Sequence, residues 1–153
     1  MILVDTNILL RLAQPGHSHR QPAMDAISLL TVHGGEPFAI APQNIYEMYV
    51  VCSRPAGENG FGMTSQQAHA EITGVRAHFL LLPETAQVYA IWEGLIGQYA
   101  IRGKRAHDAR LVAMMIEHHV PRLLTFNDDD FRQFAAIRTV NPFDVLGIPR
   151  GAR

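Results

Sequence analysis

The chain has 153 residues, which is the size of one ordinary globular domain. Its hydrophobic fraction of 48% is typical of a folded domain, and its 13 Lys and Arg nearly balance its 14 Asp and Glu. The resulting formal charge of −1 excludes a strong overall attraction to nucleic acid or to an anionic membrane, so such binding needs a local basic patch. Cys52 is the only cysteine, which excludes an intramolecular disulfide and suits a reducing cytosol. The apolar N-terminus has no basic leader and carries Asp5 and Asn7, so we expect neither a signal peptide nor a membrane span.

Five short apolar runs are spaced along the chain and predict buried strands. In chain order they cover residues 2–4, 38–41, 79–82, 123–125 and 137–140. Helical patterns are predicted over residues 8–12, 22–32, 43–53, 65–78, 86–99, 108–119 and 128–134. The segments 14–21, 54–63 and 100–107 are rich in Gly, Pro or charged residues and predict loops. Strands that alternate with helices predict an α/β fold in three layers, with a parallel sheet of about four to five strands between helices.

Several helix starts carry a capping residue. Thr6 or Asn7 can cap the turn over 8–12, and Thr85 can cap the helix over 86–99. Thr64 followed by Gln67 is typical of a capping box.

Acidic residues lie where these strands end or where helices begin. Asp5 directly follows the first strand, and Glu47 lies on the helix after the second. Asp108 lies in the first turn of a later helix, and Asp128–Asp130 follow the fourth strand. The carboxyl ends of parallel strands share one edge of an open sheet, so we expect these acids to meet there. Carboxylates brought together repel one another unless a cation neutralises them, which predicts a Mg²⁺ or Mn²⁺ site and phosphodiester cleavage.

Each of these acids also has a structural explanation. Asp5 can cap the helical turn that follows it, although the next two residues can do the same. Glu47, beside the apolar face of its helix, can be an ordinary solvated glutamate. Asp108 is stabilised by the helix dipole, by roughly 0.3–1 kcal/mol, and this role is compatible with metal binding. A solvated turn with an N-cap explains at least one of Asp128–Asp130.

One basic loop lies beside the predicted acidic site. Arg102, Lys104 and Arg105 directly precede the helix that carries Asp108 and can hold phosphates beside the scissile bond, although a solvated surface loop explains them equally well. Candidates to extend this basic rim are Arg11, His17, His19 and Arg20. Candidates to contact the substrate or a metal-bound water are Asn7, Thr125 and Asn127. The eight histidines show no grouping typical of a zinc site.

The order of these motifs resembles that of PIN-domain ribonucleases, in particular the VapC-type toxins of bacterial type II toxin–antitoxin pairs. The resemblance rests on a glutamate one helical turn beyond the second strand and on three sequence stretches. These are I-L-V-D-T-N-I-L-L at 2–10, H-D-A-R-L-V-A at 107–113 and L-L-T-F-N-D-D-D-F at 123–131. The similarity extends to about Val145, which predicts a PIN domain over 1–146 and a C-terminal tail over 147–153.

The resemblance implies a Mg²⁺- or Mn²⁺-dependent endoribonuclease whose acidic triad is Asp5, Glu47 and Asp108. The fourth polar position of the family falls at Asn127, which departs from the all-acid pattern, and Asp130 matches the acid before the Phe. We expect Asp5 and Asp108 to bind the metal directly, while Glu47 and Asp130 act through water or on a second ion. The resemblance also implies an RNA substrate, a cognate antitoxin protein, a homodimer and a cytoplasmic location.

Three other functions stay open. A phosphotransferase of the D-x-D-x-T type needs Asp at position 7 and Thr at position 9, but the chain has Asn7 and Leu9, and Lys104 is its only lysine. A housekeeping PIN nuclease in RNA processing differs from a toxin only in lacking a neighbouring antitoxin gene. A degenerate, non-catalytic PIN binding module is compatible with Asn127, and titration with Mn²⁺ separates it from an enzyme.

Overall fold

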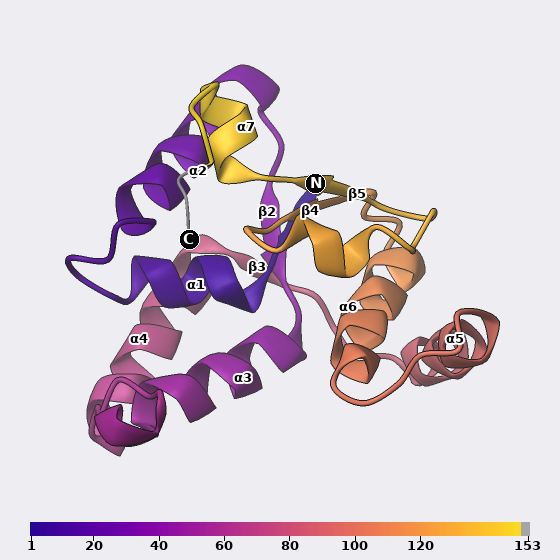
Figure 1. Cartoon of the computed structure of the whole chain (residues 1–153), viewed down its shortest axis with the longest axis horizontal. Helices are drawn as coiled ribbons and strands as arrows, with labels where there is room; N and C mark the ends of the chain where they lie inside the picture. The colour runs from indigo at the N-terminus through magenta and orange to yellow at the C-terminus, as the bar shows by residue number, and fades with distance from the viewer. Residues whose placement is uncertain (151–153) are drawn as a thin grey trace.

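A fully parallel sheet of five strands organises the computed structural model, which describes residues 1–150 (Figure 1). Its strands are β1 (Ile2–Val4), β2 (Phe38–Ile40), β3 (Leu80–Leu81), β4 (Arg122–Leu124) and β5 (Arg138–Val140). Their order across the sheet is β3-β2-β1-β4-β5, so β1 is central and Leu3 lies beside both Ala39 and Leu123. The predicted α/β fold and parallel sheet are therefore confirmed. Residues 151–153 of the predicted tail lie outside the described residues.

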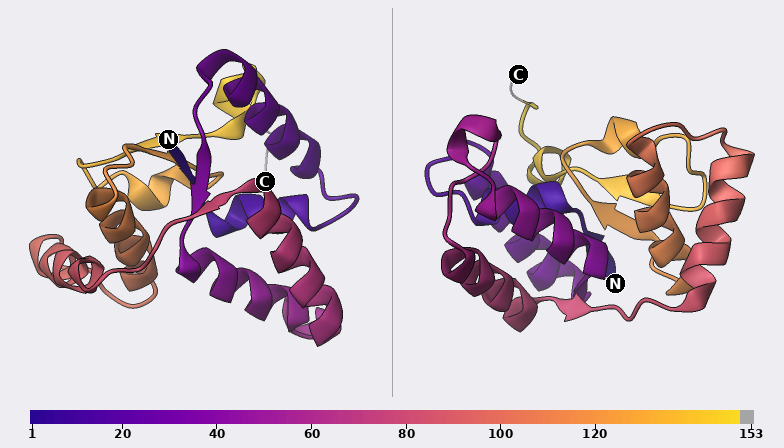
Figure 2. Two further views of the ribbon diagram at one scale, coloured as in Figure 1. Left: turned by 180° about the vertical axis from the view of Figure 1, so that it is seen from behind. Right: turned by 90° about the horizontal axis from the view of Figure 1, so that it is seen from below.

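Helices cover both faces of the sheet (Figures 1 and 2). One side holds α1 (Thr6–Leu12), α2 (Arg20–Gly34), α3 (Pro42–Ser53), α4 (Ser65–His78) and α7 (Pro142–Leu146). The other side holds α5 (Ala86–Gln98) and α6 (Arg105–Glu117). Two short 3₁₀ turns complete the described structure, η1 (Ala56–Glu58) and η2 (Asp128–Phe131). Within residues 1–150, no helix has both the length and the apolar character needed to cross a bilayer.

The central strands are buried on both sides because their alternate side chains feed two separate cores. Leu3 and Leu123 belong to the core that α5 and α6 cover. Val4, Ile40 and Leu124 belong to the core beneath α1, α3 and α4. Burial of each such side chain contributes roughly 1.5–3 kcal/mol, which fixes the strand register firmly. Polar side chains that follow these strands are therefore held at one well-defined edge.

The helix starts differ from the prediction at several points. The Thr64 capping box is confirmed, since Thr64 Oγ1 accepts from Gln67 N at 3.2 Å. The predicted side-chain cap by Thr85 is wrong, because its hydroxyl donates instead to Glu117 Oε1 on α6 at 2.8 Å. Thr6 and Asn7 do not cap α1 either, since Asp5 occupies the N-cap position and makes no side-chain cap hydrogen bond.

Two segments at the same edge of the sheet were also predicted differently. The loop predicted over 100–107 is shorter, because residues 105–107 already belong to α6. The helix predicted over 128–134 is reduced to the 3₁₀ turn η2. Helix α7 was not predicted, since Asn141-Pro142 was interpreted only as a strand end. In the structure Asn141 Oδ1 caps this helix by accepting from Phe143 N at 3.1 Å.

Candidate active site

Asp5 leaves the end of β1 and is fixed by two neutral donors. Its Oδ2 accepts from Asn7 Nδ2 and from Thr125 Oγ1, both at 2.7 Å. Asn7 Nδ2 also donates to Thr125 Oγ1 at 2.9 Å, which ties α1 to the residue that follows β4. A hydrogen bond from the Thr6 backbone also acts on this carboxyl and lowers its pKa. The carboxylate of Asp5 is therefore held in place by uncharged donors.

Glu47 is fixed in the same way from the first turns of α3. Its Oε1 accepts from Gln43 Nε2 and its Oε2 accepts from Thr6 Oγ1, both at 2.7 Å. Asn44 is fully buried, and its Nδ2 donates to Thr6 Oγ1 at 3.1 Å. The glutamate is thus held rigidly by amide and hydroxyl groups rather than solvated freely.

Helix α6 brings Asp108 to the same edge. Gln43 Nε2 donates to the backbone oxygen of His107 at 3.0 Å, which fixes the first turn of α6 against α3. Asp130 of η2 approaches from the other side, where Arg105 Nη2 lies 3.8 Å from its Oδ1. Within residues 1–150, burial and neighbouring charges act on the carboxyl of Asp108, and no hydrogen bond does.

The pKa values of two carboxyls reflect their burial first and the neighbouring acids second. Burial raises the pKa of Asp5 to about 6, and repulsion from Glu47 and Asp108 adds to this effect while the Thr125 hydrogen bond opposes it. Burial likewise raises the pKa of Asp108 to about 6, with repulsion from Asp130 and Glu47 outweighing the attraction of Arg105. Four acids from four separate segments therefore share one electrostatic environment, in which Arg105 and His107 only partly offset the repulsion at Asp108.

The donor set fits a hard divalent cation. All its charged groups are carboxylate oxygens, the ligands that Mg²⁺ and Mn²⁺ prefer. In the described residues, no three His, Cys, Asp or Glu side chains converge as a preformed ligand set. One or two direct carboxylates with water and substrate oxygens are the usual arrangement for Mg²⁺. The carboxylates of Asp5 and Asp108 suit that arrangement.

Comparison with known families agrees with this geometry, since residues 2–137 match the family model for the PIN domain. The chain belongs to the PIN-domain family. No curated protein sequence matches it.

Solved structures of similar fold include VapBC and VapC proteins and a toxin–antitoxin complex from Klebsiella pneumoniae. VapBC2 from Rickettsia felis, bound to promoter DNA, matches with a TM-score of 0.67 and 16% identity over 92% of this chain and 98% of that one. VapC20 from Mycobacterium tuberculosis, described as a sarcin–ricin loop cleaving toxin, matches with a TM-score of 0.63 and 17% identity over 88% and 95%. VapBC-1 from nontypeable Haemophilus influenzae matches with a TM-score of 0.65 and 16% identity over 93% and 98%. At these identities the likeness establishes a shared fold.

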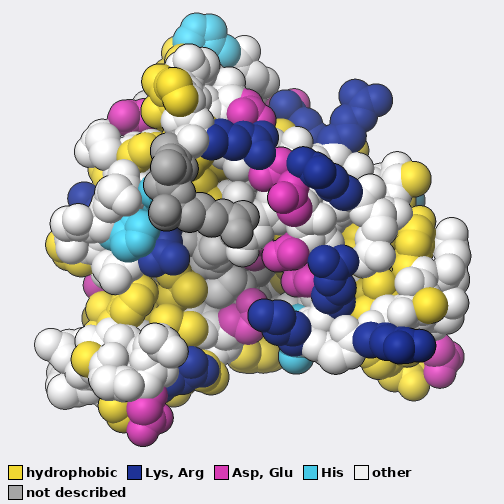
Figure 3. Space-filling view, viewed as in Figure 1, with side chains coloured by type: hydrophobic (Ala, Val, Ile, Leu, Met, Phe, Trp, Pro, Cys, Tyr) yellow, Lys and Arg dark blue, Asp and Glu magenta, His cyan; other side chains and the backbone are white. Residues whose placement is uncertain are grey.

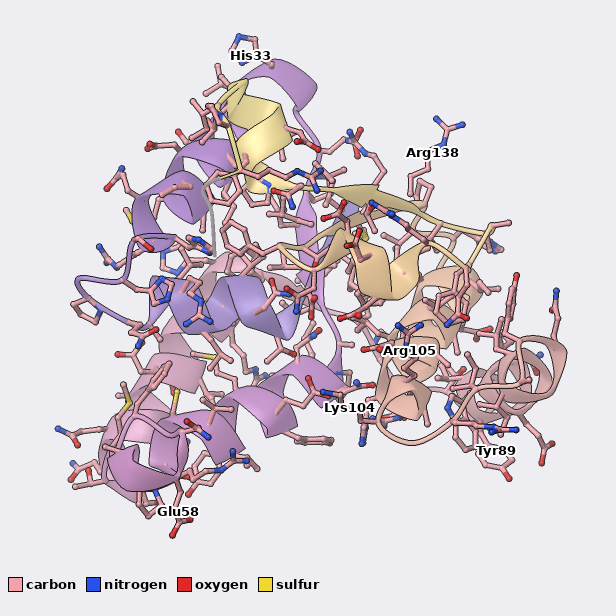
Figure 4. All side chains as sticks on the ribbon, viewed as in Figure 1. His33, Glu58, Tyr89, Lys104, Arg105 and Arg138 are labelled. Carbon is pink, nitrogen blue, oxygen red and sulfur yellow. The ribbon has the colours of Figure 1, made fainter. Side chains whose placement is uncertain are left out.

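The PIN domain carries its acids in the middle of one face, with cations beside them (Figure 3). Arg102 and Lys104 are exposed, and Lys104 and Arg105 lie together at the start of α6 (Figure 4). Asn127 is also exposed. Thr125 is fully buried, and its hydroxyl donates to Asp5 while accepting from Asn7 and from Asn127 N. Its geometry is that of a residue that orients Asp5 and has no free polar atom for substrate.

The basic rim proposed from the sequence divides into two parts. Arg20 Nε donates to the backbone oxygen of Leu12 at 3.1 Å, and the side chain borders an apolar groove away from the acids. Arg11, by contrast, borders a polar cavity next to them, together with His19. The prediction that Arg11 and Arg20 extend one basic rim is therefore wrong, because Arg11 borders the polar cavity and Arg20 borders the apolar groove.

The three aspartates after β4 also have different surroundings. Asp128 accepts from Arg150 Nη1 at 2.8 Å and from Asn141 Nδ2 at 3.0 Å. Arg132 Nη2 lies 2.6 Å from Asp129 Oδ1. Of the three aspartates, only Asp130 acts on Asp108 strongly enough to raise its pKa.

Sequence reasoning missed three buried polar residues that hold the acids, Thr6, Gln43 and Asn44. A signal for them exists, since Pro42-Gln43-Asn44 places two amides directly after a strand, at the edge where Asp5 was expected. Their common task is to orient Glu47 and to connect α1, α3 and α6.

Proposed function

We propose that this PIN domain is a metal-dependent endoribonuclease and the toxin component of a toxin–antitoxin pair. The observation that supports this most is the acidic cluster, in which Asp5 and Asp108 have raised pKa values and, within residues 1–150, Arg105 and His107 only partly offset the repulsion at Asp108. A protein bears such repulsion only where it serves a purpose, and a divalent cation would relieve it.

In this proposal Asp5 and Asp108 hold Mg²⁺ or Mn²⁺ directly. When bound, the ion lowers the pKa of water and neutralises charge that develops on the phosphate under attack. Glu47 and Asp130 act through water or on a second ion, and Thr125 keeps Asp5 oriented by its 2.7 Å hydrogen bond. Arg102, Lys104 and Arg105 attract the phosphates on either side of the scissile bond.

The proposed substrate is RNA. Support comes from the M. tuberculosis neighbour, which is described as cleaving the sarcin–ricin loop, and from the basic side chains beside the acids (Figure 3). Such loops are recognised by shape and by their unstacked bases.

The proposed partner is an antitoxin, as in the Klebsiella pneumoniae neighbour, which is described as a toxin–antitoxin complex. A groove of about 820 Å³ between α1, α2 and α4 is lined by Leu12, Met24, Ile27 and Phe79, and it suits an amphipathic segment of such a protein. This partner is tested by co-purification with the product of a small neighbouring gene. We expect the two proteins to co-purify and the Met24→Glu variant to lose the partner. We also propose a homodimer, to be measured by light scattering.

Cleavage assays on purified wild-type protein test the nuclease directly. Total cellular RNA is incubated with Mg²⁺, with Mn²⁺ or with a chelator, and the new ends are sequenced. In-line attack by water predicts 5′-phosphate and 3′-hydroxyl ends that form only with metal. Cleavage in chelator, or ends with 2′,3′-cyclic phosphate, would contradict the proposal. Binding of RNA and antitoxin without any cleavage would instead support the degenerate module, and cleavage with no antitoxin gene nearby would support a housekeeping nuclease.

A further inference from the structure

A second hollow lies directly beside the acidic cluster. It is a polar cavity of about 470 Å³, within the range of small-molecule sites, about 300–1,000 Å³. Residues from α1, η2, α7 and the segment before α2 line it, among them Asn7, Arg11, His19, Phe126, Phe143 and Arg150. Asn7 and Asp130 border both this cavity and the acidic cluster, so the two spaces are contiguous.

Each of the three aspartates that border this cavity lies near an arginine, and the pair at Asp130 is the loosest. Asp128 pairs with Arg150, Asp129 with Arg132 and Asp130 with Arg105, at distances of 2.8, 2.6 and 3.8 Å.

Arg11 is the exception among the arginines of this cavity. Within residues 1–150 its guanidinium has no carboxylate partner, and its Nη1 donates only to the side-chain oxygen of Gln14 at 2.7 Å. Arg11 is also partly buried and close enough to His17 and His19 to help lower the pKa of both, after burial itself. A half-buried guanidinium with unused donors is suited to an anion supplied from outside, and its fork matches phosphate.

Three aromatic rings border the same cavity as that guanidinium. His19 lies 4.8 Å from Phe126 and 5.1 Å from Phe143, measured between ring centroids, and the two Phe rings lie 5.4 Å apart. All three side chains are only partly buried and border the cavity. Partly exposed rings beside a cation are the features by which proteins bind single-stranded RNA, through base stacking and phosphate contact together.

We propose that this cavity is a nucleotide-binding subsite, where Arg11 holds a phosphate of the RNA strand and the ring cluster of His19, Phe126 and Phe143 receives a base. The inference rests on the proposed ribonuclease function and gives the RNA strand a path across the molecule. The strand would pass from the basic loop before α6, over the acids, to this polar cavity. The nucleotide bound here would lie next to the scissile phosphate, because Asn7 and Asp130 border both this cavity and the acidic cluster.

Fluorescence anisotropy with a labelled single-stranded oligoribonucleotide of about 12 nucleotides tests the subsite. The parent protein carries Asp108→Asn, so that cleavage does not interfere, and Arg11→Gln, Arg11→Lys and Arg138→Gln are made in it. Arg138 is the matched control because it is exposed and starts β5, at the opposite end of the strands (Figure 4). We expect Arg11→Gln to weaken binding about tenfold or more, the loss of a charged hydrogen-bonded contact.

The salt dependence makes the outcome specific. Loss of one phosphate contact to a single strand reduces the slope of log affinity against log salt by about 0.7 in Arg11→Gln, while Arg11→Lys keeps most of it. Arg138→Gln should stay within about twofold of the parent, since an exposed cation far from the strand contributes little. Equal effects of Arg11→Gln and Arg138→Gln, or no binding by the parent at sub-millimolar protein, would overturn the subsite. The cleavage assay with wild-type protein is independent of this outcome, so failure of one proposal is distinguishable from failure of the other.

Discussion

Two groups of carboxylates lie at the same edge of this sheet and are treated in opposite ways. Asp5 and Asp108 receive neutral donors or none, and burial with mutual repulsion raises their pKa values to about 6. Asp128 is partly buried too, which by itself would raise its pKa, but hydrogen bonds from Arg150 and Asn141 outweigh burial and lower it. The difference therefore has two parts: Asp5 and Asp108 are more deeply buried, and Asp128 has an arginine of the chain as a partner.

This contrast separates the acids that maintain the fold from those available for chemistry. Arg150 joins Asp128 to Asp144 and so fastens the segment after α7 to η2. Within residues 1–150 no cation pairs with Asp5, so its charge is available for a ligand. The following predictions test this separation, from the largest expected effect to the smallest.

Removing the charge of either Asp5 or Asp108 should abolish cleavage. Asp5→Asn and Asp108→Asn each keep the size of the side chain but remove a negative ligand, so we expect activity on RNA to fall by about 10³-fold or more. Asp144→Asn is the matched control, since Asp144 is exposed and pairs with Arg150 away from the acidic cluster. Full activity of both cluster variants would refute the site, provided that circular dichroism finds all three variants folded.

Divalent cations should stabilise the wild-type protein and not Asp108→Asn. At a concentration ten times its dissociation constant, Mn²⁺ adds about 1.4 kcal/mol to the free energy of unfolding. For a chain of this size that corresponds to a rise in melting temperature of about 3–6 °C. Differential scanning fluorimetry with and without Mn²⁺ measures it, and isothermal titration gives the affinity. An equal rise in Asp108→Asn would place the ion elsewhere on the molecule.

Sequence reasoning located the strands and the acids more reliably than the groups that hold them. The apolar runs that became β1, β2 and β4 are buried on both sides, so hydrophobic pattern alone defines them. The functions of Thr6 and Gln43 depend on contacts over 41 and 64 positions of sequence, which no local pattern encodes. The three adjacent aspartates look alike in the sequence, and only the placement of Arg150 and Arg132 distinguishes them.

Thr125→Val should alter the pH dependence of cleavage more than the stability of the fold. The Thr125 hydroxyl lowers the pKa of Asp5, so its loss raises that pKa further above 6. We expect the acidic limb of the rate profile to move to higher pH and the maximal rate to fall about tenfold. Thr125→Ser keeps the hydroxyl and should restore the wild-type profile. A lower rate with an unmoved profile would mean that Thr125 acts only through packing.

The smallest expected effect concerns how the free energy of unfolding of the metal-free protein depends on pH. Substitutions of Asp108 and Asp128 should change it with opposite signs. Because the folded state raises the pKa of Asp108 to about 6, its favourable contribution is present below about pH 4 and is lost as the pH rises towards 6. Asp108→Asn should therefore match the wild type at low pH and exceed its stability by about 1–2 kcal/mol above pH 6, after allowance for solvent screening.

Asp128 should behave in the reverse sense. Its pKa is lowered on folding, so its contribution is present above the unfolded pKa and disappears as the pH falls. Asp128→Asn should thus lose up to about 1 kcal/mol at neutral pH, the range of a partly exposed ion pair, and nothing in acid. Urea unfolding in chelator across the pH range measures both differences. Profiles of the same sign would mean that pairing with an arginine of the chain does not distinguish Asp128 from Asp108.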